Sequence, residues 1–192
     1  MDEEILNLAQ ACRYEKQHSH QVADIALKLF DQLKPSHSLT GDDRNLLECA
    51  GILHDIGWIK GRAQHHKTGR DIILDSEIPF PPAEKTILAL VVRYHRKTLP
   101  QETHKYYGDL DPAAKKKVCI LAGLLRLADG LDRSHRSLVR NLSCKVSPSE
   151  VKVTLVTEVP VSEELIYGGK KADLLEQCLK RKIILECGLI SK

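Results

Sequence analysis

The sequence contains no apolar run that approaches the ~20 residues needed to span a membrane as a helix. Its first residues, Met1-Asp2-Glu3-Glu4, are acidic, whereas a signal peptide begins with basic residues. None of the 6 cysteines belongs to a C-x-x-C pair, which argues against a zinc ribbon and against a disulfide framework. These absences predict a cytoplasmic protein with reduced, mostly buried thiols.

A phosphate-binding loop of the G-x-x-x-x-G-K-[ST] type is also missing, so a P-loop enzyme is excluded. We interpret Gly168-Gly169, before Lys170, as a turn. The net charge of +3 is too small to predict nucleic-acid binding, and we expect neither specific DNA binding nor a membrane partner. With 42% hydrophobic and 29% charged residues, the 192-residue chain has the composition of a globular protein with one buried core.

Helical spacing of apolar residues dominates the first 140 positions. Thr40 and Asp43 resemble a capping box at the start of one helix. The expected helices cover residues 2–12, 18–34, 40–57, 65–75, 83–95 and 112–129.

Beyond Asn141 the apolar residues alternate, which predicts a β-hairpin over 142–155 with a Ser-Pro-Ser turn. A last helix near 162–180 and a third strand at 183–185 follow. The predicted fold class is therefore mainly α, with a helical domain over 1–140 and a small α+β subdomain over 141–192 packed on it.

Nine histidines stand out in this chain, and a helical pattern places His18 inside. On the helix expected at 18–34, His18 shares a face with Val22 and Leu29, whereas His20 lies roughly 200° away and should face solvent. A lone inward histidine is more often a hydrogen-bonded core residue than a metal ligand. His18 becomes a ligand candidate only if other ligands face it.

An adjacent histidine and aspartate, His54-Asp55, lie in the apolar stretch AGILHDIG. A carboxylate among apolar residues must be compensated by a charge or by hydrogen bonds. Asp55 can cap a neighbouring helix, pair with Arg62 or Arg93, or bind a metal ion.

A second inward carboxylate, Asp129, ends the stretch VCILAGLLRLADGL, whose apolar residues on all sides indicate a central buried helix. Arg126 or Arg133 can neutralise it as an ion pair. Alternatively, Asp129 joins the two histidines and the carboxylate above to form the nitrogen and oxygen ligand set of a divalent metal ion.

The order His18, His54-Asp55, Asp129 resembles the HD superfamily of metal-dependent phosphohydrolases, whose helical fold binds a metal ion through an H…HD…D quartet. The resemblance covers about residues 12–140. It implies that the quartet holds a divalent ion, and mixed His and Asp ligands without thiolates favour Mn²⁺ or Mg²⁺. Asp55 is the expected catalytic residue, which orients or deprotonates a water molecule.

Longer stretches are similar to the C-terminal HD-like domain of the exopolyphosphatase and guanosine pentaphosphate phosphatase family. They are YEKQHSHQVADIALKLFDQL, ECAGILHDIGW, HHKTGRDIIL, VVRYHRKTLP and LLRLADGLDRSHR. The α+β tail over 142–188 resembles that domain too. Actin-like ATPase-fold domains normally precede this region in the family; the 192 residues do not contain them, so we do not expect their chemistry here.

His65 and His95 lie where HD phosphodiesterases with two metal ions place further histidine ligands, so one ion or two remain open. Contact with phosphate or solvent is the alternative for both histidines, and His66 competes with His65. Trp58 is interpreted as core or pocket wall. The basic residues expected to bind phosphate oxygens are Lys67, Arg96, Lys97, Arg126 and Arg133.

The sequence thus predicts a metal-dependent phosphohydrolase that acts on a phosphate ester or anhydride. The resemblance implies a small phosphorylated substrate, either a nucleotide or a polyphosphate. The alternative is a non-catalytic module that binds polyphosphate or nucleotide, or that dimerises. A homodimer is compatible with both interpretations.

Overall fold

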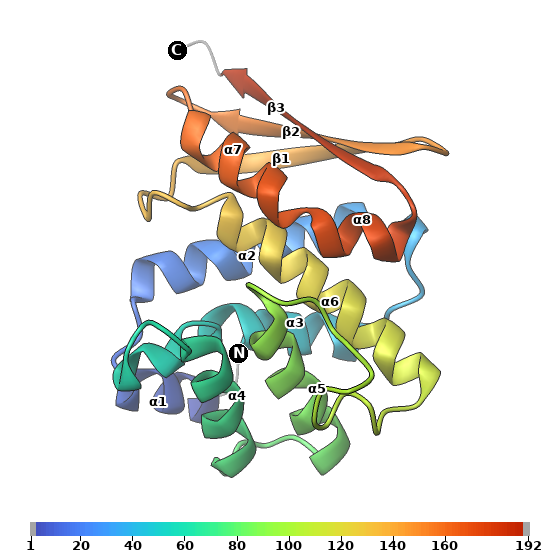
Figure 1. Cartoon of the computed structure of the whole chain (residues 1–192). Coiled ribbons are helices and arrows are strands. Elements are labelled where there is room, and N and C mark those ends of the chain that lie inside the picture. The colour runs from blue at the N-terminus through green and yellow to red at the C-terminus, as the bar shows by residue number, and fades with distance from the viewer. Residues whose placement is uncertain (1–2, 190–192) are drawn as a thin grey trace.

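The computed structural model describes residues 3–189, which form a mostly helical molecule with a three-stranded sheet near the C-terminus (Figure 1). The helices are α1 (Glu3–Ala11), α2 (Lys16–Gln32), α3 (Gly41–Leu53), α4 (His65–Asp75), α5 (Pro82–Tyr94), α6 (Pro112–Gly130), α7 (Ser162–Lys171) and α8 (Asp173–Leu179), with short 3₁₀ turns η1 (Lys34–Ser36) and η2 (Ile56–Lys60). The strands are β1 (Val139–Val146), β2 (Glu150–Thr157) and β3 (Lys182–Leu189).

Local signals in the sequence set several helix starts. The capping box of α3 is confirmed, because the Thr40 hydroxyl accepts a hydrogen bond from the Asp43 amide and the Asp43 carboxylate accepts one from the Thr40 amide. At α6, Asp111 accepts a hydrogen bond from the amide of Ala114, and Pro112 occupies the first turn, where a missing N–H costs nothing.

Helix α6 is the centre of the molecule. It packs against α2, α3 and α5 on one side and against α7 and α8 on the other. Leu121, Leu124 and Leu125 are fully buried in these contacts. One apolar core extends from Ile5 in α1 to Ile183 in β3, while the expected domain boundary near residue 140 stays a prediction.

The hairpin expected after Asn141 is confirmed: β1 and β2 pair antiparallel. Val151, Val153 and Leu155 on one face of β2 are fully buried, as the alternation predicts. The third strand runs parallel to β2, and α7 and α8 make the crossover between them. These two helices lie between the sheet and α6 in Figure 1.

Two expected elements differ from the structure. Helix α3 ends at Leu53, not near Gly57, so that His54 and Asp55 lie in the turn before η2. The helix expected over 162–180 is divided at Ala172 into α7 and α8, and Gly168-Gly169 lies within α7, so our interpretation of it as a turn was wrong. Within residues 3–189, no helix has the length and apolar character that crossing a membrane requires.

Candidate metal centre

The four residues of the H…HD…D pattern lie together, although they come from three separate parts of the chain. His18 is in the first turn of α2, His54-Asp55 follows α3, and Asp129 is close to the end of α6. The Nε2 atoms of His18 and His54 are 3.3 Å apart. His18 Nε2 is 3.6 Å from Asp129 Oδ1, and His54 Nε2 is 3.5 Å from Asp55 Oδ2.

The other oxygen of Asp55 faces a second pair of histidines. Asp55 Oδ1 is 2.9 Å from His65 Nε2 and 3.6 Å from His95 Nε2, and these two nitrogens are 3.3 Å apart. Asp55 therefore belongs to two clusters, one with His18 and His54 and the other with His65 and His95. In each cluster the candidate ligand atoms lie within 4.8 Å of one another. The geometry allows one ion in each cluster, with Asp55 shared.

Each of the four histidines in these clusters points its Nδ1 atom at a hydrogen-bond acceptor. The acceptors are Asp132 Oδ2 for His18 (2.8 Å), Gly51 O for His54 (2.8 Å), Arg62 O for His65 (2.9 Å) and Val92 O for His95 (2.6 Å). Because these oxygens only accept hydrogen bonds, each Nδ1 donates and each Nε2 faces the centre, the arrangement typical of metal-ligating histidines. The guanidinium of Arg96 also lies 3.2 Å from both ring nitrogens of His65. Two bare lone pairs 3.3 Å apart repel each other unless a proton or cation lies between them.

Burial and charge around the cluster shift several pKa values. Burial opposes protonation of His18, but its contacts with Asp129 and Asp132 outweigh burial and raise the pKa to about 9. Burial lowers the pKa of His54 and holds that of His95 well below its ordinary value. Burial raises the pKa of the Asp129 carboxyl, but Lys171 and His18 more than offset this, and the net shift is strongly downward. At neutral pH and without a metal ion, we therefore expect His18 to be an imidazolium beside the ionised carboxylate of Asp129.

A glycine brings His65 to the cluster. A Cβ atom on Gly57 would lie 2.0 Å from the carbonyl oxygen of His65, so only glycine permits this close contact between η2 and the start of α4. His66 is buried without facing the cluster, and burial together with Arg93 lowers its pKa to about 3. Of the two competing histidines, the structure therefore brings His65 to Asp55.

Two residues that we did not predict hold His18 in place. Asp132 is fully buried, binds His18 Nδ1 and accepts a second hydrogen bond from the Ser137 amide at 2.8 Å. The ring of His135 stacks on that of His18, with centroids 3.7 Å apart and planes inclined by 3°. Asp132 lies three residues after Asp129, the spacing at which two side chains share one side of a helical turn. This spacing is the sequence feature from which Asp132 could have been predicted at the site.

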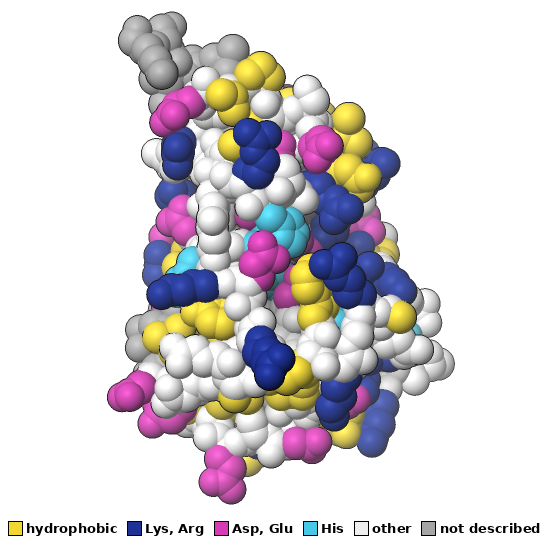
Figure 2. Space-filling model, turned by 90° about the vertical axis from the view of Figure 1, so that its left-hand side faces the viewer, with side chains coloured by type: hydrophobic (Ala, Val, Ile, Leu, Met, Phe, Trp, Pro, Cys, Tyr) yellow, Lys and Arg dark blue, Asp and Glu magenta, His cyan; other side chains and the backbone are white. Residues whose placement is uncertain are grey.

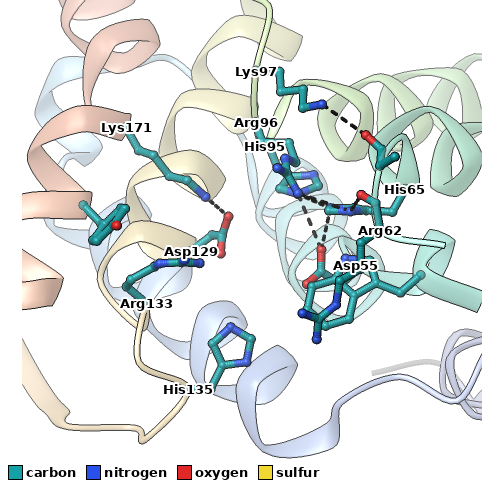
Figure 3. Close-up of a pocket in the computed structure, with 13 residues that line it drawn as sticks. Asp55, Arg62, His65, His95, Arg96, Lys97, Asp129, Arg133, His135 and Lys171 are labelled. Atoms are coloured by element: carbon teal, nitrogen blue, oxygen red, sulfur yellow. Dashed lines mark hydrogen bonds and ion pairs between the residues drawn. The ribbon is translucent and has the colours of Figure 1, made fainter.

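A cleft of about 810 Å³ opens over Asp55, His65, His95 and Asp129. Trp58 and Tyr167 contribute aromatic surface to it, which agrees with Trp58 as a pocket wall. The cationic residues that line it are Arg62, Arg96, Lys97, Arg133 and Lys171. Figure 3 shows Lys171 and Arg133 on one side of the cleft and Arg62, Arg96 and Lys97 on the other. On the face in Figure 2, histidine and acidic side chains lie together near the middle, with Lys and Arg side chains around them.

Among the expected phosphate-binding residues, Arg96, Lys97 and Arg133 line this cleft. Lys67 is exposed and lies outside its lining. Arg126 is buried and is bound by two hydrogen bonds to Asp173, at 2.9 and 2.8 Å. Its guanidinium therefore joins α6 to the start of α8 and does not line the cleft.

The arginine ion pairs that we considered as alternatives for the two carboxylates are not among their contacts. Asp129 pairs with Lys171, a residue that we did not predict, and not with Arg126 or Arg133. Asp55 is surrounded by histidines and does not pair with Arg62 or Arg93. Both oxygens of Asp55 thus face histidines, whereas Asp129 turns one oxygen to His18 and the other to Lys171.

Fold and site together define a mainly helical protein in which buried histidines and aspartates face a basic cleft. The chain matches the family model described as "Ppx/GppA phosphatase, domain III" over residues 2–175, and it belongs to this family. A curated relative is the guanosine-5'-triphosphate,3'-diphosphate pyrophosphatase of Aeromonas salmonicida (strain A449), which is 27% identical over 152 residues. The aligned region covers 78% of this chain and 30% of the relative, so the chain spans less than a third of that protein's length.

Proposed function

We propose that this chain is a metal-dependent phosphohydrolase of the HD type, which acts on a phosphate ester or anhydride of a nucleotide or polyphosphate. The observation that carries the proposal is that the Nε2 atoms of His54, His65 and His95 lie within 3.6 Å of the two oxygens of Asp55, a residue that lines a cleft with basic walls. The Nε2 atom of His18 joins this group 3.3 Å from that of His54. Membership of the phosphatase family supports it, as does the relative's name, which describes a pyrophosphatase of a guanosine polyphosphate.

In this proposal His18, His54, Asp55 and Asp129 hold one divalent ion, Mn²⁺ or Mg²⁺, and His65 and His95 hold a second ion with Asp55. A bound ion of this kind lowers the pKa of a coordinated water toward neutrality. Asp55 lines the cleft, where its carboxylate can orient the attacking water and accept its proton. Arg96, Lys97 and Arg133 bind the phosphate oxygens, on which negative charge develops.

The test compares two neighbouring histidines of α2. The chelator-stripped chain is titrated with Mn²⁺ by calorimetry, and hydrolysis of pyrophosphate, tripolyphosphate and guanosine tetra- and pentaphosphates is assayed with Mn²⁺ present. We expect His18→Ala to lose Mn²⁺ binding and turnover, because His18 is fully buried in the cluster. His20→Ala is the matched control and should change both by less than about twofold, because His20 is exposed on the opposite face.

A non-catalytic module that binds polyphosphate is the second candidate, and the basic walls of the cleft favour it. Such a module binds tripolyphosphate equally well with Mn²⁺ and in excess chelator, and it hydrolyses none of the substrates. If the wild-type chain shows that result and no Mn²⁺ binding, the enzyme proposal is wrong and the binding module replaces it.

A further inference from the structure

Lys171, on α7, forms an ion pair with Asp129, one of the candidate metal ligands. Its ammonium pairs with Asp129 Oδ2, while the other oxygen of Asp129 faces His18 Nε2 at 3.6 Å. Both partners are only partly buried, with 24% of the Lys171 side chain and 14% of the Asp129 side chain exposed. The ammonium thus lies at the edge of the cluster and also lines the cleft.

A close helix crossing brings Lys171 to this place. A Cβ atom on Gly130 would lie 2.8 Å from the Cα of Gly168 and 2.9 Å from the carbonyl oxygen of Tyr167. The backbones of α6 and α7 therefore touch where these two glycines meet. Asp129 is one residue before Gly130, and Lys171 is nearly one helical turn after Gly168, so the crossing directs the two side chains toward each other.

The pairing has a consequence for metal binding. A divalent ion held by Asp129 carries the same sign of charge as the ammonium of Lys171, and the two repel each other. Lysine has a long, flexible stem, so its ammonium can turn from Asp129 into the cleft without any movement of α7. There it lies on the same wall as Arg133, on the opposite side from Arg62, Arg96 and Lys97 (Figure 3).

From this geometry we infer that Lys171 competes with the metal ion for Asp129 and that, once the ion is bound, it binds a phosphate group in the cleft. This inference rests on the proposed function, and it adds a substrate-binding residue on α7. Metal binding releases the ammonium that the phosphate needs, so phosphate binding through Lys171 follows metal binding.

The test uses the whole chain and two affinities. Mn²⁺ is titrated into the chelator-stripped protein, and inorganic phosphate is then titrated into the Mn²⁺-saturated protein. We expect Lys171→Met to bind Mn²⁺ about tenfold more tightly, because its competitor is gone, and phosphate about tenfold more weakly, because a charged hydrogen bond is lost. Lys170→Met is the matched control, since Lys170 is exposed and does not line the cleft, and it should leave both affinities unchanged.

Two further variants keep the test decisive. Lys171→Gln serves in place of Lys171→Met if the latter does not fold, as judged by its melting curve in chelator. Lys171→Arg keeps the charge and should retain phosphate affinity within about threefold, because guanidinium groups also bind phosphate.

The inference is overturned if the neutral variants bind Mn²⁺ no more tightly than wild type, or if their phosphate affinity at saturating Mn²⁺ is unchanged. A wild-type chain that does not bind Mn²⁺ overturns the proposed function as well. Wild-type Mn²⁺ binding with no response to the neutral variants overturns only the role of Lys171.

Discussion

Replacing Asp132 with asparagine tests whether the cluster depends on the anchoring of Nδ1 in His18. Asp132 Oδ2 lies 2.8 Å from His18 Nδ1, and both side chains are only 1% exposed. The carboxylate fixes the ring orientation and increases the basicity of Nε2, the atom that faces His54. Asparagine has nearly the same volume but carries no charge, so the change separates electrostatics from packing.

The expected loss can be worked out from these contacts. Loss of an outer hydrogen-bond partner of a ligating histidine typically weakens metal affinity by about 10–100-fold, which is about 1.4–2.8 kcal/mol. The metal-free protein should also be destabilised, because the imidazolium of His18, with its pKa of about 9, loses one of its two carboxylates. Asp129 still faces this ring and asparagine retains an acceptor oxygen, so we expect about 1–3 kcal/mol, less than for a fully broken buried pair.

Calorimetric titration with Mn²⁺ measures the first effect, and urea unfolding in excess chelator measures the second. Asp109→Asn removes an exposed carboxylate between α5 and α6 and serves as the control for charge alone. A folded Asp132→Asn protein whose Mn²⁺ affinity stays within twofold of wild type would refute the idea that Nδ1 anchoring prepares His18 for a metal ion.

Two other substitutions test residues that position the elements next to the centre: Asp43 caps α3, the helix that precedes His54, and Gly57 contacts the start of α4, which carries His65. Burial opposes ionisation of Asp43, but the contact with Lys117 prevails and lowers the pKa of this carboxyl. The ionised carboxylate therefore stabilises the fold above about pH 4, the pKa range of an unfolded carboxyl. This contribution is lost as the pH falls through the lower pKa of the folded protein. We expect Asp43→Asn to cost about 1–2 kcal/mol in urea unfolding at pH 7, and the difference from wild type should shrink below about pH 4. Gly57→Ala should displace His65 and reduce the Mn²⁺ stoichiometry by one, with about 1–3 kcal/mol of overpacking cost. Gly169→Ala, where an added Cβ meets open space, should do neither.

Helical periodicity correctly predicted which face of α2 is buried. His18 is fully buried and His20 is exposed, because the spacing of the apolar residues fixes the face that packs on α3 and α6. The same reasoning failed at Gly168-Gly169. Local preference marks two glycines as a turn, but the crossing of α7 over α6 needs residues without side chains within a helix. A tertiary contact of this kind is not visible in local sequence.

The candidate site was predictable where the pattern itself contained the residues. The structure brings the four quartet residues together, and their role as metal ligands stays a prediction. Lys171 and His135 were missed because each reaches the centre through packing between distant segments. Arg126 shows the converse: a basic residue near Asp129 in sequence points away from the cleft, because its guanidinium binds Asp173 and the carbonyl oxygens of Tyr94 and Lys97.

The last turns of α6 contribute residues both to the packing of α8 and to the candidate metal centre. Arg126 joins α6 to the start of α8, and three residues later Asp129 faces both the histidine cluster and Lys171 of α7. Because α7 and α8 are consecutive, the contact made by Arg126 helps to fix the helix that carries Lys171. Tyr167 and Lys171 of α7 therefore complete one wall of the cleft beside Arg133, and Lys171 adds a second cationic contact to Asp129, which also faces His18. The packing of α7 and α8 on α6 therefore places the ammonium of Lys171 beside the candidate metal centre.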